Sequence, residues 1–89
     1  MIGPDAMPRF APGVKLRFDQ TRQAWVVLAP ERLFMPDEHA VEILKLVDGA
    51  RAAGAIVDDL AQRFDAPRET IEADVLEMLQ DLVDRGVLR

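Results

Sequence analysis

The 89-residue sequence has no cysteine, no serine and no tyrosine, and His39 is its single histidine. Without cysteine the chain has no disulfide, thiolate zinc site, iron–sulfur cluster or cysteine nucleophile, which fits a reducing cytosol. A metal site would need carboxylates alone, and His39 is expected to face solvent from the first turn of a helix. The paired acids fall on polar helix faces, so no buried acid pair with a shifted pKa is expected. The sequence therefore predicts no enzyme, no metal site and no cofactor.

Long hydrophobic runs are also missing. No apolar stretch approaches the roughly 20 residues that span a bilayer. The first residues have neither the basic region nor the apolar region of a secretory signal. We predict a cytoplasmic protein without membrane association, in which residues 1–7 form a flexible lead-in and residues 8–89 form a single domain.

Positive charge is scarce, because 11 basic residues stand against 16 acidic ones and the formal net charge is −5. The phosphates of nucleic acids and anionic membranes repel such a surface. The third predicted helix, where a recognition helix would lie, carries six acids against Arg68 and Arg85. We therefore expect no nucleic-acid partner and favour a neutral or basic partner segment.

The first third of the chain has the period-two pattern of strands. Val14, Leu16 and Phe18 alternate with basic residues, and the polar residues 19–23 are typical of a hairpin loop. Residues 25–28 are apolar on both faces, as expected of a middle strand. Residues 32–35 form a third short strand, which Pro36 ends because proline cannot donate to a ladder.

The rest of the chain is predicted to be helical. A first helix is capped by Asp37, extends to Val47 and ends at Asp48-Gly49. A second runs over residues 53–64, and a third runs from Arg68 to Arg85 and stops at Gly86. The tail Val87-Leu88 packs back or adds a short strand. The predicted fold is α+β and winged helix-turn-helix-like, with a three-stranded antiparallel sheet followed by a three-helix bundle.

The third helix has a wide apolar surface. Ile71, Val75, Met78 and Leu82 form one stripe, and further apolar residues widen the arc to roughly 160°, against the ≳ 100° of a half-buried helix. Either the sheet or the tail covers the extra apolar margin of the helix, or this margin borders an open groove beside the strand at residues 32–35. That strand has an unpaired edge. Either Arg32 and Pro36 protect this edge from pairing, or a peptide adds to it as a fourth strand.

The groove hypothesis names two sets of peptide-binding residues. The edge strand contributes Arg32, Leu33, Phe34 and Met35, and the helix margin contributes Val75, Leu76, Leu79 and Val83. Backbone groups of the strand would fix the direction and register of the peptide, and the helix margin would take its apolar side chains.

Residues that carry a family resemblance occur in order along the chain. They are Pro8-Arg9, Gly13, Asp19, Arg22, residues 25–28, Pro30-Glu31, Ala40, Ile43-Leu44, Leu46, Asp48-Gly49, Ile56, Leu60, Phe64, Val75, Leu79, Leu82, Gly86 and Leu88. On this set, residues 8–89 resemble the PqqD family of pyrroloquinoline quinone (PQQ) biosynthesis. The family usually has threonine or serine just before the second helix, where this chain has Ala52, so that helix is expected to be less well capped.

The resemblance implies a recognition domain for ribosomally made, post-translationally modified peptides (RiPPs). PqqD-like proteins are chaperones that bind the precursor peptide PqqA and deliver it to PqqE, a radical SAM enzyme that cross-links a glutamate to a tyrosine. Related domains bind the leader as an added strand beside the third strand and against the third helix. In this chain these elements are residues 32–35 and the helix margin named above.

Three alternatives stay open on the sequence. The chain is a recognition domain of the same fold in another RiPP pathway, or a winged-helix regulator that binds DNA or protein. In the third, the open edge pairs with itself, so that a monomer is in exchange with a weak homodimer.

Overall fold

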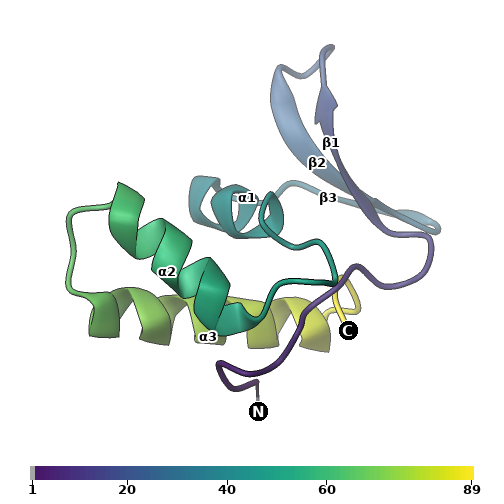
Figure 1. Ribbon diagram of the computed structural model, residues 1–89. Coiled ribbons are helices and arrows are strands. Elements are labelled where there is room, and N and C mark those ends of the chain that lie inside the picture. The colour runs from purple at the N-terminus through teal and green to yellow at the C-terminus, as the bar shows by residue number, and fades with distance from the viewer. Residues whose placement is uncertain (1) are drawn as a thin grey trace.

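The computed structural model describes residues 2–89 as a three-stranded sheet followed by three helices (Figure 1). The strands are β1 (Lys15–Asp19), β2 (Ala24–Ala29) and β3 (Arg32–Phe34), and the helices are α1 (Glu38–Leu44), α2 (Ala53–Arg63) and α3 (Arg68–Asp84). The sheet is antiparallel with the order β1-β2-β3. The predicted fold class and element order are therefore confirmed.

β2 is the middle strand, as its two-sided apolar pattern predicted. Val26 and Val27 are neighbours in the strand and point to opposite faces, yet each is only 1% exposed. The register pairs Val27 with Leu16 of β1 and with Phe34 of β3. These three side chains form a row on one face of the sheet, and the row packs against the helical core.

The β1–β2 hairpin is closed by the carboxylate of Asp19. Its Oδ1 accepts hydrogen bonds from the backbone N–H of Thr21 at 2.9 Å and of Arg22 at 3.2 Å. Its Oδ2 accepts from the Arg22 guanidinium at 2.6 Å. These bonds, chiefly the one from the Arg22 side chain, lower the pKa of Asp19 because they favour the charged carboxylate. Figure 1 shows this hairpin projecting away from the helices.

Helix α1 begins as predicted but ends early. Asp37 Oδ1 accepts a hydrogen bond from the N–H of Ala40 at 2.8 Å, which is a side-chain N-cap. The predicted extension to Val47 is wrong, because the regular helix ends at Leu44. The N–H groups of Leu46 and Val47 bond to carbonyls three residues earlier, the spacing of a 3₁₀ turn. Val47 is nevertheless buried in the core.

The start of α2 is capped by the backbone of the N-terminal segment. Ala52 forms no side-chain cap, as its residue type predicted. Instead the N–H of Ala53 donates to the carbonyl of Ala6 at 2.7 Å, and the N–H of Gly54 donates to the carbonyl of Pro4 at 2.8 Å. Two of the donors that a helix start leaves unpaired are thus satisfied from residues distant in sequence. The flexibility predicted for residues 1–7 stays a prediction, and residue 1 lies outside the described residues.

Helix α3 ends in a Schellman motif at the predicted glycine. Gly86 has a φ of 81°, its N–H donates to the carbonyl of Val83, and the N–H of Val87 donates to the carbonyl of Leu82. The tail then turns back, and Leu88 forms an antiparallel bridge with Phe10. Both predicted features of the tail, packing back and short strand pairing, are present.

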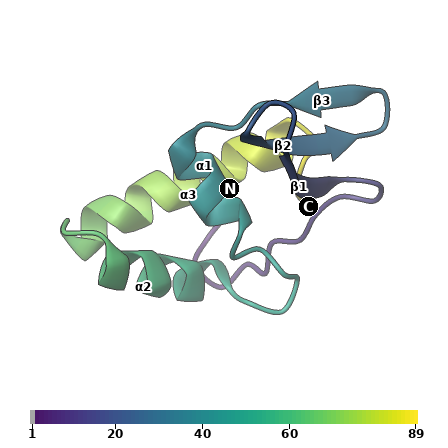
Figure 2. The ribbon, with the colours of Figure 1, turned by 90° about the horizontal axis from the view of Figure 1, so that it is seen from above.

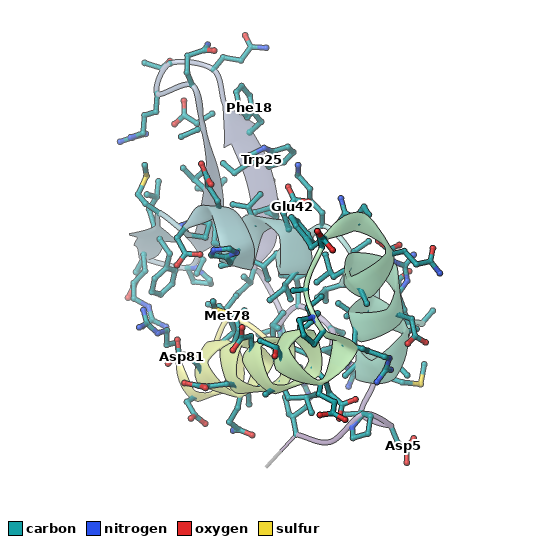
Figure 3. All side chains as sticks on the ribbon, turned by 90° about the vertical axis from the view of Figure 1, so that its left-hand side faces the viewer. Asp5, Phe18, Trp25, Glu42, Met78 and Asp81 are labelled. Atoms are coloured by element: carbon teal, nitrogen blue, oxygen red, sulfur yellow. The ribbon has the colours of Figure 1, made fainter. Side chains whose placement is uncertain are left out.

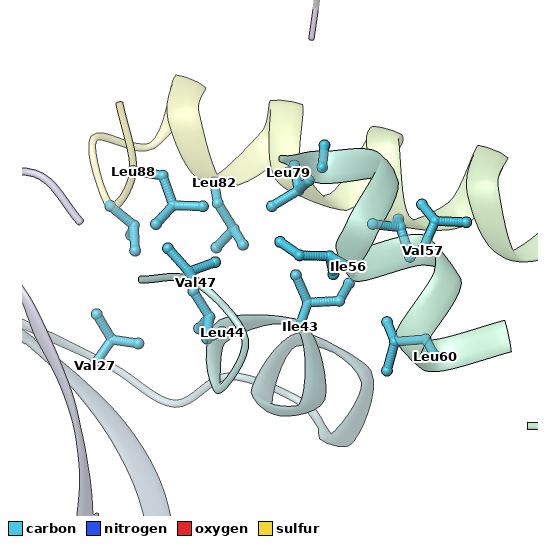
Figure 4. Packing of buried hydrophobic residues seen from close by; sticks show 13 residues of the cluster. Val27, Ile43, Leu44, Val47, Ile56, Val57, Leu60, Leu79, Leu82 and Leu88 are labelled. Atoms are coloured by element: carbon cyan, nitrogen blue, oxygen red, sulfur yellow. The ribbon is translucent and has the colours of Figure 1, made fainter. Parts of the chain in front are cut away.

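The core lies between the helices and the inner face of the sheet. Ile56 of α2 and Leu79 of α3 are both 0% exposed. Figure 4 shows them close together, with Val47 and Leu82 beside them. The interior of α3 is therefore sealed chiefly by α2 and by the segment around α1, and this orientation decides which flank of α3 faces the sheet.

Candidate peptide-binding groove

The outer edge of β3 is free of strand partners within residues 2–89. β3 pairs with β2 on one side and is the last strand of the sheet on the other. Figure 2 shows it at the margin of the sheet. The unpaired N–H and C=O groups of such an edge can accept another strand. The predicted open edge is therefore present.

A hollow of about 270 Å³ lies between β3 and the C-terminal half of α3. Val27, Leu82 and Val87 are buried and supply an apolar floor. Met35, 57% exposed, stands at the edge of the hollow just after β3. An extended peptide on the edge of β3 would therefore have beside it a depression with an apolar floor and polar side chains on its rim.

Arg32 contacts two residues that line this hollow. Its guanidinium lies 5.0 Å from the centre of the Phe34 ring and donates a hydrogen bond of 3.4 Å to the carbonyl of Arg85. A cation suits this position, because the C-terminal end of α3 carries partial negative charge. Arg32 thus holds β3 against the end of α3.

The strand residues predicted for the site lie at the edge strand, but they do not all face the hollow. Phe34 and Met35 line it. Leu33 is 43% exposed, and the alternation of a strand directs it to the opposite face from Phe34. Leu33 is therefore placed to offer backbone groups to a partner strand rather than a contact inside the hollow.

The helix residues predicted for the site lie elsewhere. Val75 is 3% exposed and Leu79 is 0% exposed, and both belong to the core. Leu76 and Val83 lie on the flank of Gln80, whose Oε1 accepts the N–H of Ile2 at 2.8 Å. That flank adjoins the N-terminal segment and not β3. The predicted arrangement of these four residues beside the edge strand is therefore corrected.

The flank of α3 that does border the hollow carries Met78, Asp81, Leu82 and Arg85. Asp81 and Arg85 form an ion pair of 3.0 Å on its rim. Met78 and Leu82 belong to the apolar stripe that the sequence predicts along α3. The apolar periodicity predicts that both residues lie on the apolar side of the helix. It does not predict how the helix is rotated about its axis, because that rotation depends on the packing partners.

Two side chains in the structure have shifted pKa values. The pKa of Asp19 is lowered in the hairpin, and hydrogen bonds from Arg68 to Asp58 and Glu72 raise the pKa of Arg68 at the start of α3. Both groups lie outside the hollow. Within residues 2–89 no three acidic or histidine side chains converge as metal ligands, and no helix is long and apolar enough to cross a membrane. The groove presents backbone hydrogen-bonding groups of the β3 edge, an apolar floor and an ion pair on its rim.

Comparison with known proteins agrees with this geometry. The family model for coenzyme PQQ synthesis protein D (PqqD) matches residues 24–88. The chain belongs to the PqqD family. The resemblance inferred from the sequence is thus confirmed.

Relatives in this family are similar over almost the whole chain. A PqqA binding protein of Rhodopseudomonas palustris (strain BisB5) is 59% identical over 83 residues, which are 93% of this chain and 78% of that protein. The bifunctional coenzyme PQQ synthesis protein C/D of Methylorubrum extorquens is 49% identical over 82 residues, 92% of this chain and 22% of the relative. The PqqD sequence therefore also occurs as one part of a longer protein.

Solved structures match the fold. The solution NMR structure of the PqqD truncation of Methylobacterium extorquens PqqCD, described as a functional, stand-alone RiPP recognition element, is 45% identical with a TM-score of 0.82, covering 100% of this chain and 95% of that one. The crystal structure of PqqD from Xanthomonas campestris is 37% identical with a TM-score of 0.61, covering 100% and 99%. Lasso peptide synthetase B1, complexed with its leader peptide, has a TM-score of 0.79 at 15% identity, covering 94% and 99%, and so shows the fold alone.

Proposed function

We propose that this chain binds the precursor peptide PqqA as a strand added to β3 and presents it to the radical SAM enzyme PqqE. The observation that carries the proposal is the free edge of β3 beside a hollow with an apolar floor. The name of the relatives, PqqA binding protein, supports the choice of peptide. A role without catalysis and a cytoplasmic location are part of the same proposal.

The proposed contacts divide the work between backbone and side chains. β3 has three residues, so an added strand gains only about three ladder bonds of about 1 kcal/mol each. Two apolar side chains buried against Phe34, Met78 and Leu82 add about 1.5–3 kcal/mol apiece. These contacts total about 6–9 kcal/mol before the cost of ordering the peptide, so at this site alone the dissociation constant should be weaker than the micromolar value that corresponds to about −8 kcal/mol.

This geometry makes a demand on the peptide. In an added strand, alternate side chains point to opposite faces, so one set meets the hollow and the other lies on the side of Leu33. The peptide should therefore carry apolar residues two positions apart in the part that pairs with β3. A recognition domain of another RiPP pathway would use the same edge, and competition between unrelated leader peptides and PqqA would separate the two functions.

The test uses two methionines of similar exposure. Met35 at the hollow is 57% exposed and Met7 in the N-terminal segment is 52% exposed. Met35→Glu should weaken binding of a synthetic PqqA peptide about tenfold, because it places a charge beside the apolar floor. Met7→Glu should leave the affinity unchanged. Calorimetry measures both, and equal affinities for the two variants would refute the proposed site.

A further inference from the structure

A second and wider hollow lies between α1, the C-terminal end of α2 and α3, with a volume of about 860 Å³. Its floor is apolar, because Ile43, Leu60 and Val75 line it and are buried. Phe64, just after α2, is 46% exposed beside this floor. Exposed apolar surface in a depression of this size marks a binding surface on a small domain.

The rim of the wide hollow is acidic. Its six carboxylates belong to Glu42, Asp65, Asp74, Glu77, Asp81 and Asp84. Arg63 neutralises Glu42 at 3.1 Å, and Arg85 neutralises Asp81 at 3.0 Å. In the described part of the chain, Asp65, Asp74 and Glu77 form no ion pair. The rim therefore has negative charge to spare beside an apolar floor.

The wide hollow adjoins the hollow beside β3. Met78 and Asp81 line both, and Figure 3 shows their side chains projecting from the same side of α3. The combined groove runs from Phe34 past the start of α1 to Phe64. From Asp81 to Ile71 it follows α3 for about 15 Å, enough for about four or five residues of extended chain.

We propose that the wide hollow receives the segment of the bound peptide next to the part that pairs with β3, and that it selects a basic side chain next to an apolar one. The inference rests on the proposed function and adds a specificity rule to it. The apolar side chain covers the floor near Phe64 and Ile71. The basic side chain pairs with Asp74 or Glu77, and a charge-assisted hydrogen bond at the edge of an apolar surface is stronger than one in open water.

The adjacency of the two hollows and the acidic rim of the wide hollow together favour this occupant. A nucleic acid or an acidic segment would be repelled by the rim. A separate protein that touched only the wide hollow would make no use of its connection to β3. A single chain in both hollows gains from the linkage, because binding at one hollow raises the effective concentration at the other.

The test reverses the charge of the unpaired acids. Asp74→Lys with Glu77→Lys changes the net charge by four and relieves repulsion among the acids of α3, so the fold should persist, as circular dichroism would show. The matched control compares Glu77→Lys alone with Asp5→Lys alone. Both acids are exposed, and each change raises the net charge by two. Asp5 lies on the other side of α3 from Met78 (Figure 3).

The probes are a synthetic PqqA peptide and a copy in which every lysine and arginine is replaced by glutamine. At about 50 mM salt, where screening is weak, the double variant should bind PqqA about tenfold more weakly than the wild type does. Glu77→Lys alone should show part of that loss, and Asp5→Lys should show less than a twofold change. The glutamine copy should bind the wild type and the double variant equally.

Each other result overturns the inference in a distinguishable way. If the double variant binds PqqA as tightly as the wild type, or loses the same factor for both peptides, the wide hollow does not select a basic side chain. If its PqqA affinity is unchanged while its affinity for PqqE falls, the hollow is a docking site for the enzyme instead. If the wild type fails to bind PqqA at all, the proposed function fails and the inference fails with it.

Discussion

Both flanks of α3 carry apolar side chains, yet only one of them is covered by another segment of the chain. On one flank Leu76, Gln80 and Val83 adjoin the N-terminal segment, and Ile2 bonds to Gln80 and packs against the core. On the other flank Met78 and Arg85 border a hollow beside the free edge of β3. The first flank is covered by the chain itself, and the second is left open within residues 2–89. An apolar helix face therefore marks a binding site only where no segment of the same chain lies over it.

The largest expected effect tests whether the interior of α3 is distinct from its open flank. Leu79→Ala should lower the free energy of unfolding by about 2–5 kcal/mol, because it leaves a cavity at a side chain that is 0% exposed. Met78→Ala should cost about 1 kcal/mol, since that side chain is only partly buried. Denaturant unfolding measures both. Similar losses of unfolding free energy for the two variants would mean that Met78 belongs to the core as Leu79 does, and not to an open flank.

A smaller effect tests the covered flank. Removing residues 1–7 should lower the free energy of unfolding by about 1–3 kcal/mol, because the hydrogen bonds that cap α2 are lost. Ala52→Ser should restore about 1 kcal/mol to the shortened chain by supplying a side-chain cap, and it should add little to the full chain, whose donors are already paired.

The affinity for PqqA is the control in the shortened chain. It should be unchanged, because the open flank of α3 is untouched. Loss of peptide affinity together with an unchanged free energy of unfolding would contradict this account. It would mean that the flank beside the N-terminal segment, and not the flank beside β3, binds the peptide.

The smallest expected effect lies far from both flanks, at the hairpin. The pKa of Asp19 is lowered in the folded protein, so its contribution to stability is full above its ordinary pKa of about 3.9 and is lost as the pH falls through the lower folded value. Asp19→Asn should therefore lower the melting temperature slightly at neutral pH, and the difference from wild type should vanish in strong acid. A difference that persists at low pH would show that the charge of Asp19 is not responsible.

The fold was predictable from the sequence because its signals are local. The Asp37 cap, the stop at Gly86 and the alternation around Leu16 each depend on a few neighbouring residues. The early end of α1 was not predicted, since apolar spacing continues to Val47 while the backbone tightens after Leu44. The step of three residues from Leu44 to Val47 fits a 3₁₀ turn as well as an α-helix.

The candidate site was predictable only in part. The free edge of β3 follows from strand order, which short connections dictate. The residues of α3 that form the wall of the groove do not follow from the sequence, because the apolar arc of α3 is wide enough to place either flank beside β3. The packing of Val75 and Leu79 against α2 and the segment around α1 sets the orientation. The N-terminal segment then adjoins the flank of Gln80, and its carbonyl bonds to the start of α2 leave no pattern in side chains.

The central claim is that PqqA becomes a fourth strand on β3. Isotope-filtered nuclear Overhauser spectroscopy of labelled protein with unlabelled PqqA measures this most directly. We predict contacts between the peptide backbone and residues 32–35, together with contacts from peptide side chains to Met78 and Leu82. Contacts to β1 or to Leu76 and Val83, with none to residues 32–35, would contradict the claim.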